Sequence, residues 1–149
     1  MAYTNLRKGR FSETGREYLV TCVTGQRQPV FTDFVAARLL VDELRRSQRE
    51  GHCEWLAWVV MPDHFHGLLS LAENSDLSRL MNQIKGCGAR SVNLYLARQG
   101  ALWQPGFHDH ALRTEENRLA IARYVVANPL RAGLVKKLAD YPHWDSVWL

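Results

Sequence analysis

Residues 54–71 read EWLAWVVMPDHFHGLLSL, and this stretch decides the fold of the 149-residue chain. Two runs rich in β-branched and aromatic residues flank Pro62-Asp63, which predicts two strands joined by a tight hairpin. Side chains two residues apart on a strand point to the same face. We therefore expect His64 and His66 to project together, while Phe65 points to the opposite face and can enter the core.

The segments around this hairpin alternate between strand-like and helix-like patterns. The predicted order is strand 18–24, helix 33–50, strands 54–61 and 64–71, helix 76–100, strand 107–113 and helix 114–128. Asp76 is expected to cap the second helix, and Thr114 to begin the third, which should end near Asn128 before Pro129. The first six elements have the βαββαβ order of the ferredoxin-like split motif, which predicts an α+β fold: an antiparallel sheet with helices packed on one face.

Composition limits the class of protein. With 46% hydrophobic and 23% charged residues, the chain is expected to form one ordered domain over residues 1–149. No apolar run reaches the roughly 18 residues of a membrane span, and the basic N-terminus lacks the apolar region of a signal peptide. Cys22, Cys53 and Cys87 are too scattered for a disulfide framework or a zinc ribbon. These features predict a cytoplasmic protein without a membrane partner.

Charge is distributed unevenly along the chain. The formal net charge is +4, made up of −1 over residues 1–76, +7 over 77–137 and −2 over 138–149. The basic block favours an anionic partner, with nucleic acid first in line. Arg outnumbers Lys fifteen to four, which suits bidentate contacts to phosphates and bases. Charge alone is equally compatible with a solvated surface.

Two His-x-His pairs are candidate metal ligands. Imidazoles on one side of a strand, as expected for His64 and His66, form a ready site for a divalent metal ion. His108 and His110 repeat the pattern on the strand before the third helix. Periodicity does not choose between the pairs, and either pair is also compatible with simple surface histidines.

The predicted third helix carries a further candidate pair. Tyr124 and Asn128 are four residues apart, so they are expected about 40° apart on one helix face. Ile121, Ala122, Val125 and Val126 form the adjoining apolar face. Tyr124 would then stand at the edge of the buried stripe and reach a cleft. A packing role for Tyr124 and a helix-stop role for Asn128 are the alternatives.

The combination of motifs resembles a known family. Met61-Pro-Asp-His64-Phe-His66 is followed by a basic helix, by Trp103-x-x-Gly-Phe, and by Tyr124-Val-Val-Ala-Asn128-Pro129-Leu-Arg131-Ala-Gly-Leu. These stretches are similar to the single-tyrosine HUH transposases, and most of all to the REP-associated tyrosine transposases. The resemblance runs from about Arg10 to Asp140-Tyr-Pro.

The resemblance implies a metal-dependent DNA transposase. His64 and His66 would ligate Mg²⁺ or Mn²⁺, Asn128 would be a third, amide-type ligand, and Tyr124 would be the nucleophile. The implied activity is that of a single-stranded DNA endonuclease and strand transferase, which cuts near REP-like hairpins through a 5′-phosphotyrosine intermediate. Two imidazoles and an amide suit Mn²⁺ at least as well as Mg²⁺. His110 is left as a further possible ligand, and Asp63 has no assigned role.

Partners and rival functions complete these expectations. The partner would be single-stranded DNA that forms hairpins from palindromes, bound by a monomer or a homodimer. One rival is a catalytically silent hairpin-binding protein of the same fold, and another is a metal-dependent nuclease that uses activated water. The candidate DNA contacts are Lys85, chosen for its place beside the apolar stripe of the second helix, and Arg118, Arg123 and Arg131.

Overall fold

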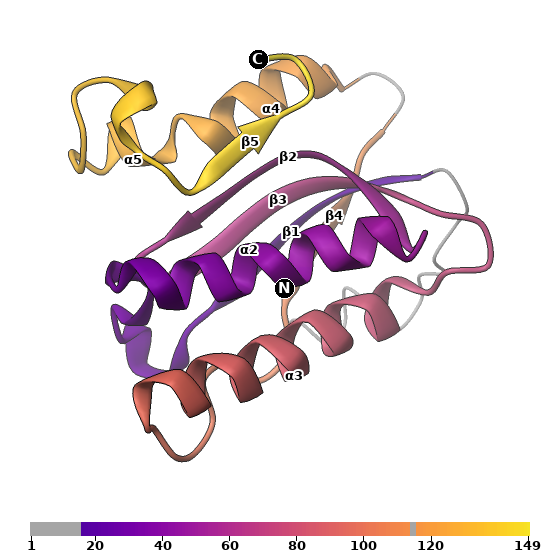
Figure 1. Cartoon of the computed structure of the whole chain (residues 1–149). Coiled ribbons are helices and arrows are strands. Elements are labelled where there is room, and N and C mark those ends of the chain that lie inside the picture. The colour runs from indigo at the N-terminus through magenta and orange to yellow at the C-terminus, as the bar shows by residue number, and fades with distance from the viewer. Residues whose placement is uncertain (1–15, 114–115) are drawn as a thin grey trace.

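A five-stranded antiparallel sheet lies at the centre of the structure, a computed structural model that describes residues 16–113 and 116–149 (Figure 1). In space the strands follow the order β4-β1-β3-β2-β5. The sheet and the order of the helices confirm the predicted α+β fold. The strands are β1 (Glu17–Val23), β2 (Cys53–Met61), β3 (His64–Leu71), β4 (His108–Ala111) and β5 (Trp144–Ser146).

Two long helices, α2 (Phe34–Arg49) and α3 (Leu77–Leu96), cover one face of the sheet (Figure 1). The side chains of Asp33 and Asp76 cap them by accepting hydrogen bonds from the backbone N–H groups of the first turn. The predicted apolar stripes of both helices are buried, except that Tyr95 at the end of the α3 stripe is half exposed. Its hydroxyl instead lies 3.3 Å from a carboxylate oxygen of Asp33.

The third helix covers the opposite face of the sheet, which the sequence did not assign. Figure 1 shows α4 (Arg118–Val126) and the short α5 (Asn128–Arg131) across the sheet from α2 and α3. Val125 and Val126 of α4 are buried there in a second core cluster. The side chains that β2 and β3 contribute to this cluster are Leu56, Ala57, Val59, Met61 and Leu68.

The bounds of the third helix correct two predictions. The helix starts at Arg118, because the side chain of Asn117 accepts the capping hydrogen bond from Ala120. Thr114, the predicted start, lies outside the described residues. At the other end α4 stops at Val126, and Asn128 opens α5, with Pro129 in its first turn. Proline is tolerated there because a first-turn N–H has no helical partner.

The predicted hairpin is present, and glycine permits its close packing. Phe65 is fully buried on the α2 and α3 face, where its ring meets that of Trp55 edge-on, with the ring centroids 5.4 Å apart. A Cβ atom at Gly67 would lie 2.9 Å from the Trp55 ring. Gly67 therefore leaves room for the Trp55 indole, and this close packing explains why a glycine lies in the middle of β3.

The C-terminal segment adds an edge strand that the sequence did not predict. β5 pairs with β2, with Ser146 opposite Ala57 and Trp144 opposite Val59. The short 3₁₀ helices are Gly25–Arg27, Val30–Thr32 and Leu138–Asp140. Within residues 16–113 and 116–149, none of the helices combines the length and apolar character that crossing a membrane requires.

Candidate active site

His64 and His66 lie side by side on β3 and face the α4 side of the sheet, as predicted. Their ring centroids are 6.5 Å apart, and the rings are inclined by 72°. The Nδ1 atom of His66 lies 2.5 Å from the Thr21 hydroxyl, and the Nδ1 atom of His64 lies 2.8 Å from a carboxylate oxygen of Asp63. With each Nδ1 atom engaged, the Nε2 atom of each ring is the one that remains to bind a ligand.

Burial and charged neighbours shift the pKa values of His66 and of Asp63 beside His64. Arg27 holds the second carboxylate oxygen of Asp63 at 2.8 Å. Burial raises the pKa of Asp63, but hydrogen bonds from His64 and Arg27 outweigh it and bring the pKa below its usual value. Burial, aided by the charges of His64 and Arg131, lowers the pKa of His66 to about 4. His66 is therefore neutral at pH 7, the state that a metal ligand requires.

Tyr124 projects from α4 and is 59% exposed, so it is a surface residue rather than part of the buried stripe. The Arg131 guanidinium lies over its ring, with Cζ 3.8 Å from the centroid, in a cation–π contact. The charge of Arg131 also contributes to the lowered pKa of His66, after burial and the charge of His64. The structure thus brings together residues from β3, α4 and α5.

Asn128 does not continue the helix of Tyr124. The helix breaks at Ala127, and Asn128 is the half-buried first residue of α5. Ala127 between the two helices keeps a right-handed helical conformation, so Tyr124 and Asn128 stay on consecutive turns of the chain, and their shared helix face stays a prediction. Among the described residues, no three His, Cys, Asp or Glu side chains gather around one point. The available donors, the imidazoles of His64 and His66 and the amide of Asn128, are of the kind that fits a divalent ion whose other ligands come from water or substrate.

The second histidine pair lies on the same face of the sheet. Thr21 on β1 is opposite both His66 of β3 and His108 of β4. His110 is engaged elsewhere, because its Nε2 atom lies 2.9 Å from the Glu116 carboxylate. That contact, together with the Arg113 backbone N–H, lowers the pKa of Glu116.

Known proteins similar to this chain identify its family. A family model described as "Transposase IS200 like" matches residues 13–128. The chain belongs to this family. The REP-associated tyrosine transposase of Escherichia coli K12 is 30% identical over an alignment of 111 residues that covers 70% of this chain. The match spans 61% of that relative's own length.

Solved structures of similar proteins agree with the family. A REP-associated tyrosine transposase bound to a REP hairpin superposes with a TM-score of 0.76 at 25% identity, covering 91% of this chain and 79% of that one. A Deinococcus radiodurans R1 protein described as a transposase gives 0.57 at 28% identity, covering 80% and 95%. The predicted resemblance to REP-associated tyrosine transposases is confirmed.

The predicted DNA contacts of this IS200-like chain fall in different places. Lys85 lies on α3, across the sheet from the histidines, and its ammonium donates to the carbonyls of Gln104 and Gly106. Arg118 forms an ion pair of 2.9 Å with Glu17. Arg123 is exposed on α4 beside Tyr124. Arg123 and Arg131 thus lie near Tyr124, whereas Lys85 stabilises the loop before β4.

Sequence reasoning missed the residues that hold the histidines. Thr21 precedes His66 by 45 residues, and nothing local in the sequence links them. Strand register links them, because β1 runs antiparallel to β3 with Thr21 opposite His66. The position of Asp63 directly before His64 in the hairpin turn was visible in the sequence. Its ion pair with Arg27 could be found only from the folded structure.

Proposed function

We propose that this chain is a metal-dependent DNA transposase that cuts and rejoins single-stranded DNA near REP-like hairpins through a 5′-phosphotyrosine intermediate. The observation that carries the proposal is the position of Arg131, over the Tyr124 ring and within electrostatic reach of His66. A nucleophile and a metal-ligand pair can then serve one phosphate. The relative of known structure, a REP-associated tyrosine transposase, holds a REP hairpin, which supports the choice of substrate.

In the proposed reaction the Tyr124 oxygen attacks the phosphorus of the scissile phosphate. The bond from phosphorus to the 3′ oxygen breaks, and a bond from phosphorus to the phenolic oxygen forms. The phenol gives up its proton to solvent, and the departing 3′ oxygen takes one up as a 3′-OH. A 3′-OH can attack the phosphotyrosine link in reverse, so rejoining needs no external energy source.

The chain's own residues position this chemistry. Arg131 fixes the phenol ring from one side and places a positive charge beside the attacking oxygen. We propose that His64 and His66, through their Nε2 atoms, and Asn128 hold Mg²⁺ or Mn²⁺. An ion held by these residues would supply Lewis-acid polarisation of a phosphate oxygen and would stabilise charge on the leaving group. Asp63 and Thr21 keep the two rings in the orientation that presents Nε2.

The test is a denaturing-gel assay with end-labelled hairpin DNA that carries single-stranded flanks, in the presence of Mn²⁺ or Mg²⁺. Wild type should form a metal-dependent covalent protein–DNA adduct, and Tyr124→Phe should form none. Tyr95→Phe is the matched control, because Tyr95 is a half-exposed tyrosine on α3, across the sheet. This control should form the adduct like wild type.

Each rival function gives a different result in the same assay. Cleavage without an adduct, unchanged in Tyr124→Phe, would indicate a nuclease that uses activated water. Firm hairpin binding without cleavage, in both wild type and Tyr124→Phe, would indicate a silent hairpin-binding protein. Either outcome would overturn the phosphotyrosine proposal.

A further inference from the structure

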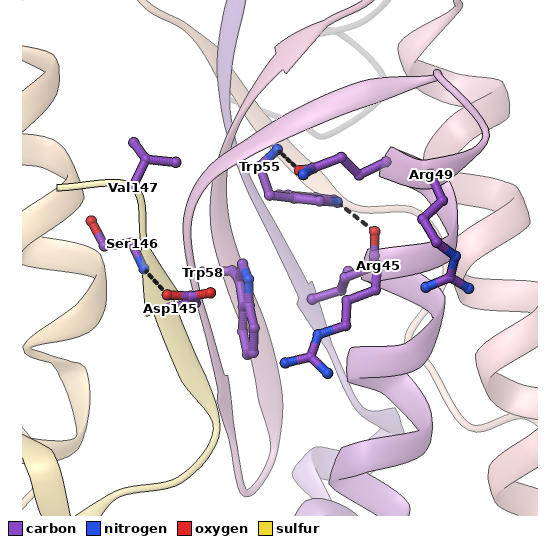
Figure 2. Close-up of a pocket in the computed structure, with 9 residues that line it drawn as sticks. Arg45, Arg49, Trp55, Trp58, Asp145, Ser146 and Val147 are labelled. Atoms are coloured by element: carbon purple, nitrogen blue, oxygen red, sulfur yellow. Dashed lines mark hydrogen bonds between the residues drawn. The ribbon is translucent and has the colours of Figure 1, made fainter. Parts of the chain in front are cut away.

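A groove of about 350 Å³ lies at the edge of the sheet, away from the histidine pair (Figure 2). It runs between the C-terminal half of α2 and the edge strand β5. Its floor is formed by Trp55 and Trp58 of β2, whose side chains face α2 rather than α4. Arg45 and Arg49 line one side and Asp145 the other. This volume is in the range of small-ligand sites.

The two arginines in the groove have no side-chain partner among the residues that the structure describes. Neither guanidinium forms an ion pair or a hydrogen bond with any residue of 16–113 or 116–149. The other arginines of α2 are engaged: Arg46 pairs with Glu43 at 2.6 Å, and Arg38 donates to the Pro142 carbonyl. Because Arg45 and Arg49 are four residues apart, they stand on one helix face and converge on the groove.

The indole of Trp58 adds a third donor. The N–H of Trp55 is used, since it donates to the Leu44 carbonyl and to Ser47. The N–H of Trp58 has no acceptor in the part of the chain that the structure describes, although the residue is only 5% exposed. Figure 2 shows the Trp58 ring standing between Asp145 and Arg45. The Trp58 Nε1 atom is not one of the enclosed polar atoms that lack a partner, so its N–H is open at the surface of the groove and can donate to a ligand there.

Asp145 makes the donor set suitable for a nucleotide rather than for a bare anion. Its carboxylate accepts a hydrogen bond from the Ser146 N–H and keeps capacity for another. Two guanidiniums can bind a phosphate, whereas the carboxylate repels one and accepts from the exocyclic amine of a base. A phosphate at one wall and an amino-bearing base at the other satisfy all of these groups.

The groove is also connected to the candidate active site. Trp58 is one residue along β2 from Val59, the partner of His66 in the sheet. At the edge strand, Ser146 lines both the groove and a small hollow beneath α4 that includes Arg123 and Trp148. Single-stranded DNA that leaves the Tyr124 side would reach the groove by passing around β5, which is only three residues long.

We infer that this groove binds one nucleotide of single-stranded DNA, with its phosphate on Arg45 and Arg49 and an amino-bearing base against Asp145 and Trp58. The choice of DNA as the ligand rests on the proposed function. The groove would hold the unpaired strand at a distance from the scissile phosphate, and so it would contribute to binding rather than to the chemical step.

Binding of fluorescein-labelled dC12 and dT12, measured by anisotropy over a range of salt concentrations, tests the inference. The double variant Arg45→Gln/Arg49→Gln should bind both oligonucleotides more weakly, and its slope of log K against log salt should fall by about 0.7 for each lost phosphate contact. Arg46→Gln, on the same helix but outside the groove, should keep the wild-type slope. Asp145→Asn should reduce the preference for dC12, whose base carries the amine, over dT12.

Several outcomes would overturn the inference. An unchanged slope in the double variant, or an equal change in Arg46→Gln, would show that the groove arginines do not contact DNA. A labelled polyglutamate peptide can be measured in the same way. If the double variant binds this peptide more weakly than wild type but binds DNA equally well, the groove is a site for an acidic protein segment. Tyr124→Phe should bind both oligonucleotides like wild type, and the groove variants should still form the covalent adduct at saturating DNA. The anisotropy titration thus tests the groove, and the adduct assay separately tests the phosphotyrosine mechanism.

Discussion

The two faces of the sheet use the same strands for different purposes. The face under α2 and α3 holds the larger core cluster, with aromatic residues such as Phe65, Trp55 and Tyr18 buried in it. The face under α4 has a smaller apolar cluster around Val125, and its remaining surface carries the histidines. One face therefore supplies most of the apolar burial, and the other has room for polar chemistry.

The alternation along β3 shows how this division works residue by residue. His64 and His66 face α4, while Phe65 between them is fully buried on the other face. A slip of one residue in register would exchange the two sets, so the buried Phe65 also fixes the orientation of the histidines. The three residues His64, Phe65 and His66 thus contribute to both the core and the candidate site, through opposite faces of β3.

Substitutions at neighbouring positions of β3 should separate the two faces, and this is the largest effect we expect. Phe65→Ala should reduce the free energy of unfolding by about 3–5 kcal/mol, because it leaves a cavity in the larger core cluster. His66→Asn should change the stability far less, yet it should remove binding of Mn²⁺. Urea denaturation and calorimetric titration with Mn²⁺ measure the two quantities. Equal destabilisation by both variants would contradict the division between faces.

The groups behind the histidines should have the next largest effect. Thr21→Val and Asp63→Ala should each weaken Mn²⁺ binding by about 10- to 100-fold, the range typical of groups that orient a metal-bound histidine. Thr21→Ser should restore the affinity, because it keeps the hydroxyl. Thr32→Val is the control, since the Thr32 hydroxyl bonds only to the Pro29 carbonyl of its own turn. Calorimetric titration gives all four affinities, and a loss in Thr32→Val equal to that in Thr21→Val would refute a positioning role.

The sequence predicted the α2 and α3 face more completely than the α4 face. Periodicity located both long helices, because their buried stripes are regular, and Asp76 caps α3 as expected. The third helix was less predictable, since Thr114 and Asn117 both suit a helix start and only the folded chain shows the Asn117 cap. The three-residue strand β5 has no pattern of its own, because its pairing with β2 defines it.

The site was predictable where chemistry lies within one element and not where register brings elements together. Residues two apart on β3 had to share a face, which placed His64 and His66 correctly. The prediction that Pro129 follows the helix end did not anticipate α5, in which Asn128 is the first residue and Pro129 lies in the first turn. The contact of Thr21 with His66 joins residues 45 apart in the sequence, a separation over which no local pattern acts.

Arg131 tests the link between the tyrosine and the histidines, with a smaller expected effect. Arg131→Gln should slow adduct formation at saturating DNA by about 2- to 5-fold, the equivalent of an exposed cation–π contact of about 0.5–1 kcal/mol. Arg123→Gln, next to Tyr124 but without this contact, should alter DNA affinity and leave the saturated rate unchanged. Single-turnover gel assays give the rates, and equal slowing by both variants would show a general charge effect instead.

The smallest effect that we expect is on the pH dependence of stability, at His143. The ring of His143 lies where the two faces of the sheet meet, in contact with Phe34 of α2 and with Tyr141 beside the α4 cluster. Burial, aided by the charge of Arg38, lowers the pKa of His143 in the folded chain. The unfolded chain therefore binds the proton first as the pH falls below about 6.5, and stability is lost with falling pH. His143→Phe should keep the ring contacts and make the free energy of unfolding less steep between pH 7.5 and 5 than in wild type, where His66 supplies the remaining dependence. His52→Phe, at a partly exposed position, serves as the control in the same urea titrations. An unchanged slope in His143→Phe would mean that this histidine takes up its proton equally well in the folded chain.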